Sequence, residues 1–108
     1  MTVISNDFTF AGYTGQIVQT SYTQGGNPAW QMFHEEHGPI ATITVNIPGL
    51  APDELAIKDY SENEGMLESL MAKDLIELPH RYVVSGFVSL PIVRKKAQGI
   101  VDVDGLSI

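Results

Sequence analysis

The sequence predicts one α+β domain over residues 1–108, a mostly antiparallel, twisted sheet of five to seven short strands with one helix packed on one face. The length of 108 residues is close to the commonest domain size, and a hydrophobic content of 44% is ordinary for a chain with a buried core. Most of the chain consists of short β-branched and aromatic runs separated by Gly and Pro, which is typical of strands. Apolar residues recur at helical spacing in one stretch, at about residues 62–75. A β-barrel with this helix as a plug or lid is the structural alternative.

Strands account for the N-terminal half of the chain. Residues 8–22 predict two short strands with a break near Gly12 or Gly15. Residues 40–47 form the clearest strand pattern, because Ala, Ile and Val alternate there with Thr and Asn. Together with a strand over residues 29–36 and the Gly-Pro turn between them, this pattern predicts a hairpin.

The helix is predicted from a start signal and an apolar stripe. Ser61 and Glu64 have the spacing of a capping box, in which each side chain accepts the other residue's amide proton. Gly65 disfavours a helix interior by about 1 kcal/mol, so its presence needs another explanation. The stripe consists of Met66, Leu67, Leu70 and Met71. We expect it to contact Ile43, Val45, Ile57, Val84 and Val88 in the core.

The C-terminal third contains further strand patterns. Arg81–Leu90 predicts a strand with a bulge or close approach at Gly86, and Pro91 predicts an edge or a bend. Residues 99–106 predict a last edge strand or a partly ordered terminus. The basic cluster Arg94–Lys96 protects an edge strand or pairs with the acidic stretch of a second copy, which would make a homodimer.

Composition excludes several classes of function. With no cysteine, the chain has no disulfide and no thiolate metal site, which fits a reducing compartment. A net charge of −7 disfavours nucleic acid and anionic lipid as partners but permits a basic protein surface. The same charge is also explained by solubility alone. With neither a signal-peptide pattern nor a long apolar run, we expect a cytoplasmic protein that does not bind membranes.

Two short motifs suggest metal ions, and neither is complete. His34 and His37 are three residues apart, whereas the helical zinc motif needs a spacing of four, and on a strand they would point to opposite faces. Asp102–Gly105 resembles part of a calcium loop, but the chain ends before the remaining ligands. We therefore expect no metal and no cofactor.

The acidic residues near the helix start are the main candidate site. They are expected to stay charged and solvated, because a helix N-terminus stabilises the ionised form, whereas catalytic carboxylates are commonly desolvated. Neither Ser61, Ser85 and Ser89 nor His80 has the sequence context of a catalytic nucleophile or base. The sequence thus favours an interaction surface over an active site, with candidate residues Asp59, Glu62, Glu64 and Glu68.

Three segments also resemble a known group of proteins. They are Ile40–Asn46, Lys58–Glu68 and Ser85–Pro91. Their pattern is a Thr-rich strand ending in Val-Asn, a polar entry to a short helix, and a Gly-aromatic strand ending near Pro. It resembles, over about residues 38–93, a family of uncharacterised small bacterial proteins carried on phages and other mobile elements. The resemblance implies an α+β fold and that genomic setting, and it supplies no catalytic residue.

Three functions remain open. The leading hypothesis is a non-enzymatic acidic binding protein of a phage or mobile element, which inhibits a host nucleic-acid-binding or defence protein by occupying its basic surface. The second is a small enzyme or ligand-binding protein with a pocket between helix and sheet near Trp30, Tyr60 and Arg81. The third is a structural, self-assembling protein.

Overall fold

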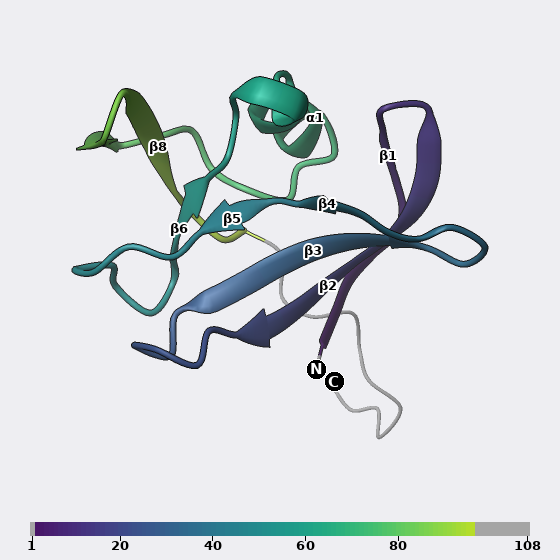
Figure 1. The fold of residues 1–108 in the computed structure, drawn as a ribbon, viewed down its shortest axis with the longest axis horizontal. Coiled ribbons are helices and arrows are strands. Elements are labelled where there is room, and N and C mark those ends of the chain that lie inside the picture. The colour runs from purple at the N-terminus through teal and green to yellow at the C-terminus, as the bar shows by residue number, and fades with distance from the viewer. Residues whose placement is uncertain (1, 97–108) are drawn as a thin grey trace.

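Residues 2–96 form two antiparallel four-stranded sheets and one short α-helix. A computed structural model describes residues 2–96 (Figure 1). The mostly antiparallel α+β prediction is confirmed, but the described residues form eight strands in two sheets instead of five to seven strands in one. The first sheet has the order β1-β2-β3-β4, formed by Thr2–Phe10, Tyr13–Ser21, Pro28–His34 and Gly38–Thr42. The second has the order β5-β6-β8-β7, formed by Thr44–Val45, Glu54–Ile57, Val88–Arg94 and Arg81–Ser85.

Ile43 is the point at which the chain passes from one sheet to the other. Its amide donates to the Trp30 carbonyl in the first sheet at 2.9 Å, and its carbonyl accepts from the Lys58 amide beside the second at 2.8 Å. The predicted continuous strand over residues 40–47 is therefore divided into β4 and β5. Thr44, expected on a polar face, is buried, and its Oγ1 accepts from the Trp30 amide at 3.1 Å.

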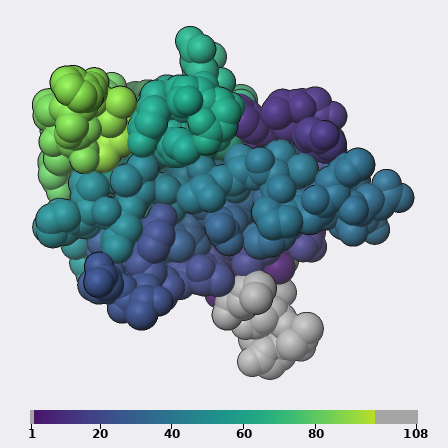
Figure 2. All heavy atoms as spheres, in the orientation of Figure 1, coloured from purple at the N-terminus to yellow at the C-terminus, as the bar shows by residue number. Residues whose placement is uncertain are grey.

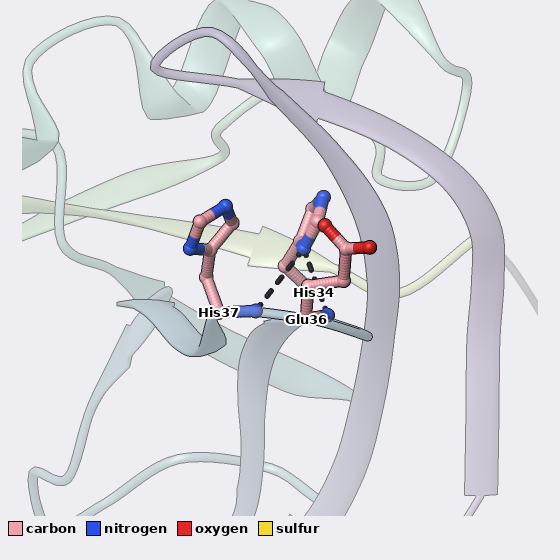
Figure 3. Close-up of side chains that lie close together, drawn as sticks. All are labelled: His34, Glu36 and His37. Atoms are coloured by element: carbon pink, nitrogen blue, oxygen red, sulfur yellow. Dashed lines mark hydrogen bonds between the residues drawn. The ribbon is translucent and has the colours of Figure 1, made fainter.

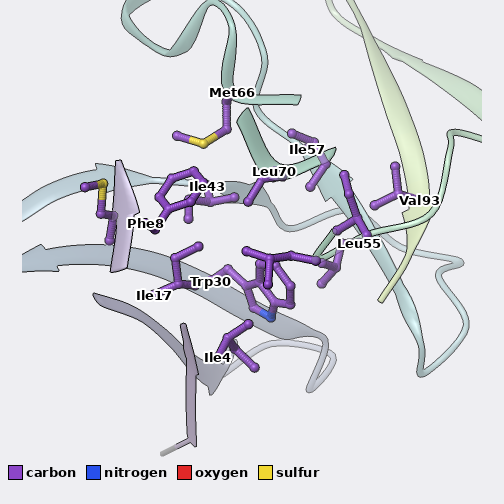
Figure 4. Packing of buried hydrophobic residues seen from close by; sticks show 13 residues of the cluster. Ile4, Phe8, Ile17, Trp30, Ile43, Leu55, Ile57, Met66, Leu70 and Val93 are labelled. Atoms are coloured by element: carbon purple, nitrogen blue, oxygen red, sulfur yellow. The ribbon is translucent and has the colours of Figure 1, made fainter. Parts of the chain in front are cut away.

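The main core contains side chains from both sheets and from the helix (Figure 4). Met66 and Leu70 of α1 are fully buried in the same cluster as Ile43 and Ile57, as expected. Val45 and Val88 pack instead against a second, smaller cluster made of Ile47, Ala56, Leu90 and Ile92. The expectation for Val84 is wrong, since 75% of its surface is exposed on the outermost strand of the second sheet.

The predicted helix over residues 62–75 is shorter and starts differently. A 3₁₀ turn, η1 (Ser61–Asn63), precedes α1 (Met66–Ala72), and Gly65 is the N-cap residue of α1 with φ +95°. The capping box does not form: the Glu64 amide donates to the Ser61 backbone carbonyl, and neither helix has a side-chain cap at its N-cap residue. The left-handed conformation explains Gly65, because residues with a Cβ rarely adopt it. The Asp59 carboxylate accepts from the Leu67 amide at 2.8 Å and supplies the missing partner in the first turn.

The segment predicted as one strand with a bulge is a hairpin. Gly86 and Phe87 form the turn between β7 and β8, and β8 lies between β6 and β7, so Pro91 is not on an edge strand. Pro91 is tolerated there because the β6–β8 ladder covers Ile92–Arg94 and stops before the proline, which has no amide to donate. Within residues 2–96, the structure contains no helix long and apolar enough to cross a membrane.

Candidate functional site

The four acidic residues selected from the sequence have different environments. Asp59 is half-buried and holds the first turn of α1 through Leu67. Glu62 pairs with Lys58 at 2.6 Å, and this contact, with the Glu62 amide and the Ser61 hydroxyl, lowers the pKa of Glu62 to about 2. Two of the four carboxylates are therefore already engaged within the molecule.

Glu64 and Glu68 are exposed, and neither makes an ion pair with another residue in the described range 2–96. Glu64 lies between η1 and Gly65, and Glu68 lies in the first turn of α1. In Figure 2 this segment projects from the surface between the β7–β8 hairpin and the β1–β2 turn. These two carboxylates are the part of the predicted site that is available to a partner.

The cations of the protein are mostly neutralised within the fold. Of the six Lys and Arg side chains, five form an ion pair within residues 2–96. The sixth, Lys95, donates to the Gln19 side chain at 3.3 Å. Each member of the basic cluster Arg94–Lys96 thus has an intramolecular partner, namely Asp53, Gln19 or Asp74. The excess negative charge consequently remains on the acids that these cations do not reach.

The three residues proposed to line a ligand pocket are placed in three environments. Trp30 is fully buried in the main core, and its Nε1 donates to Gln19 at 2.8 Å. Tyr60 packs against the second cluster, with the Lys58 ammonium 5.6 Å from its ring centre. Arg81 pairs with Glu54. Two cavities, of about 330 Å³ and about 280 Å³, are lined by other residues.

A buried carboxylate that the sequence did not indicate lies at the start of β6. Oε1 of Glu54 accepts from the Ala51 amide at 2.9 Å and from the Arg81 guanidinium at 2.9 Å, and Oε2 lies 2.5 Å from Nε2 of His80. The Arg81 contact, followed by the Ala51 amide, lowers the pKa of Glu54 to about 2, although burial opposes this shift. Because these contacts join the loop before β6 to the start of β7, the group has a structural role. Its members are separated by 26 and 27 positions, and no local spacing could have indicated it.

The histidines of the β3–β4 turn lie closer than their strand positions implied (Figure 3). The turn brings the rings of His34 and His37 to 4.7 Å between centres, so the expectation of opposite faces is wrong. Potential ligand atoms of His34, Glu36 and His37 all lie within 4.8 Å of one another.

The hydrogen bonds of His34 do not suit a metal ligand. Its Nδ1 accepts from the amides of Glu36 at 3.0 Å and His37 at 3.2 Å, so this nitrogen carries no proton. A metal-binding histidine normally donates its second ring N–H to a neighbour, whereas here the second nitrogen is an acceptor. The arrangement stabilises the turn, and a metal at Nε2 would require these two bonds to break or the ring to lose both protons. The other metal candidate, Asp102–Gly105, and the predicted strand over residues 99–106 lie outside the described residues.

The described part of the fold does not bring a serine and a histidine together, as the catalytic alternatives would require. Among residues 2–96, no serine hydroxyl is hydrogen-bonded to a histidine, and the His80 ring is already bound to the Glu54 carboxylate.

A cavity of about 330 Å³ lies beside β1, β2 and β3 and is lined by Asn6, Thr14, Gly15, Gln16, Phe33, His34 and Glu35. A second cavity of about 280 Å³ lies between two loops and is lined by Gln24, Gly25, Asn27, Asn46, Ile47 and Pro48.

No protein-family model, curated protein or solved structure matches the chain.

Proposed function

We propose that the chain is a non-enzymatic acidic binding protein of a phage or mobile element, which acts in the cytoplasm of a bacterial host. Its exposed acids at the start of α1 would occupy a basic site on a host protein, such as a nucleic-acid-binding or defence component. The observation that carries the proposal is the distribution of charge. Five of six cations are paired internally, whereas Glu64 and Glu68 face solvent in a chain of net charge −7.

The segment that carries Glu64 and Glu68 is anchored to the rest of the protein by buried side chains and by a hydrogen bond. Met66 and Leu70 are fully buried, and the Asn63 side chain donates to the Thr42 carbonyl at 2.6 Å. The shared cluster of α1 with Ile43 and Ile57 supports the view that the helix covers one sheet face. Carboxylates on an anchored segment lose less conformational freedom on binding, and a field of one sign accelerates encounter with a basic partner.

The test separates local recognition from general attraction. A tagged copy is used to capture basic partners from a bacterial host lysate, and a captured protein is purified for titration calorimetry. The double variant Glu64→Lys/Glu68→Lys should weaken binding by about tenfold or more, since each close charge contact contributes on the order of 1 kcal/mol. The matched control is Glu35→Lys/Glu36→Lys, which makes the same change of net charge in the exposed β3–β4 turn.

The control variant should change affinity by less than about threefold at 150 mM salt, where distant charges are screened. Equal losses in the two variants would show that net charge alone acts. Capture of no basic or nucleic-acid-binding protein would argue against the whole proposal.

A small-ligand function is the second candidate, and the cavity of about 330 Å³ beside Gln16 and His34 favours it. Its volume falls at the lower end of the range for ligand sites. A ligand screen by chemical-shift mapping should show shifts confined to the cavity residues and lost in Gln16→Leu. Shifts scattered over the surface would remove this candidate.

A further inference from the structure

Among residues 2–96, no strand pairs with the outer side of β7, so this strand is an open edge of the second sheet. It is the last strand in the order β5-β6-β8-β7, and its five pairs with β8 run without a register shift. The hairpin is closed by Ser85 and Val88 around a two-residue turn, so alternate residues of β7 bond to β8. The amide and carbonyl groups of Tyr82 and Val84 are therefore directed to the open side.

The other three edges of the two sheets are protected, whereas β7 is not protected by any feature in the part of the chain that the structure describes. Strand β1 has two register irregularities and carries Asp7, β4 contains Pro39, and β5 has only two residues. Prolines, charges, bulges and short length are the features that prevent edge-to-edge pairing. The only charged side chain on β7 is Arg81, which is bound to Glu54 of the same molecule.

The side chains beside this edge are apolar and exposed. Tyr82 and Val84 lie on the same face of β7 and are 61% and 75% exposed, and Phe87 in the adjacent turn is fully exposed. The segment from Leu78 to Val93 contains no acid, although the whole chain has thirteen. The least charged surface of the second sheet thus coincides with its unpaired edge.

We propose that two copies of the chain associate by antiparallel pairing of β7 with β7 around a two-fold axis at Val83. In this register Tyr82 of each copy is opposite Val84 of the other, and the free backbone groups of both residues meet as hydrogen-bonded pairs. An aromatic residue opposite a β-branched one is a favourable cross-strand pair. The interface is self-complementary and closes at the dimer, so it does not propagate into a fibre.

Charge selects a second copy as the occupant. Two chains of net charge −7 repel each other over most of their surfaces, and contact is least opposed where neither carries an acid. In the proposed register Arg81 of one copy lies opposite Ser85 of the other, so no like charges are placed in contact. This dimer leaves the acids of α1 outside the paired strands and stands independently of the function proposed above.

The first experiment measures mass against concentration by analytical ultracentrifugation. The native chain should dimerise with a dissociation constant on the order of 100 µM, because edge pairing buries a small area. Val84→Lys and Val84→Pro should each weaken the dimer at least tenfold. The lysine lowers the net negative charge, so greater repulsion cannot explain its effect, and the proline removes only an outward-facing amide. The control Thr20→Lys makes the same charge change at an exposed site on β2 and should leave the dimer intact.

The second experiment reads the register directly, using the absence of cysteine. Tyr82→Cys and Val84→Cys are oxidised separately and as a mixture. Residues directly opposite in a hydrogen-bonded pair have Cα atoms about 5.5 Å apart, within disulfide reach, whereas the two-residue offset in either variant alone is too far. The mixture should therefore cross-link at least tenfold faster than either variant alone. A chain that stays monomeric at about 1 mM, or a dimer unaffected by both Val84 substitutions, would overturn the proposal.

Discussion

Replacing the buried carboxylate of Glu54 by an amide, Glu54→Gln, should destabilise the protein more than any other single loss of charge in the described fold. Glu54 is 5% exposed and has three partners: the Ala51 amide, the Arg81 guanidinium and the His80 ring. A glutamine keeps the shape and one acceptor oxygen. Its NH₂ group, however, would face either the Ala51 amide and the Arg81 guanidinium, which are both donors, or Nε2 of His80, which accepts only when the ring carries its proton on Nδ1.

The magnitude follows from the pKa of the carboxyl group. A pKa held at about 2 instead of the ordinary 4.5 corresponds to an upper limit of about 3 kcal/mol of stabilisation of the folded state. Arg81 is 41% exposed, so solvent screens part of this interaction, and we expect a loss of about 1–3 kcal/mol in Glu54→Gln.

The pH dependence carries the clearest signature. The folded-state pKa is lowered, so the stabilisation is fully present above the unfolded pKa of about 4.5. It is lost as pH falls from 4.5 through about 2, because the unfolded state then binds the proton more readily. Urea unfolding followed by Trp30 fluorescence should give a free-energy gap between native and Glu54→Gln that is constant from pH 7 to 5 and shrinks below it.

The matched control is the exposed pair of Asp53 with Arg94, whose side chains are 54% and 47% exposed at a distance of 3.4 Å. Asp53→Asn removes one charge from the neighbouring position and should cost less than about 0.5–1 kcal/mol. Equal losses in the two variants, or a gap for Glu54→Gln that does not vary with pH, would refute the reasoning.

Three further substitutions test the local structure, each by thermal or urea unfolding. Gly15→Ala should lower the free energy of unfolding by about 1–3 kcal/mol, because its Cβ would lie 2.1 Å from the Phe33 carbonyl oxygen. The control Thr14→Ala changes an exposed residue and should cost less than about 0.5 kcal/mol. Similar losses of stability in the two variants would exclude the close approach as the cause. Asp59→Ala should cost about 1 kcal/mol by leaving the Leu67 amide without its partner. The prediction fails if Glu62→Ala costs as much, because that change removes an exposed carboxylate, its pair with Lys58 and its local contacts but leaves the Leu67 amide bound. His34→Ala should cost about 0.5–1.5 kcal/mol through the loss of two turn hydrogen bonds, with no change in the effect when zinc is added, whereas zinc-dependent stability of the native chain would revive a metal site.

Local pattern was sufficient for most of the strands. Alternation and β-branched composition identified β2, β3, part of β4 and only the end of β1, because residues 2–7 were not predicted as a strand. The break between β1 and β2 falls at Ala11-Gly12, one of the two expected positions. These features work because side chains alternate between faces in any extended chain, whatever the chain later pairs with. The burial of Met66 and Leu70 followed in the same way from the period of the helix.

The errors share one cause: the residues of a strand do not specify which other strand it pairs with. The pattern over residues 40–47 is continuous, yet the hydrogen bonds of Ile43 go to different sheets. A glycine such as Gly86 is compatible with a bulge within one strand and with a turn between two strands. The antiparallel pairing of β8 with β7 shows that Gly86 lies in a turn. The apolar side chain of Val84 predicts a core position, but Val84 is exposed because its strand is the last one in its sheet.

The candidate site divides in the same way. The sequence by itself determined the excess of acids, the absence of cysteine, the strand-rich chain and the single helical stripe, because these depend on composition and local period alone. The tertiary structure decided which charges remain available. It pairs Glu62 with Lys58, assigns Asp59 to the Leu67 amide and buries Glu54 against Arg81, leaving Glu64 and Glu68 at the surface. The physical reason is that an ion pair depends on distances between segments that only the packed fold brings together.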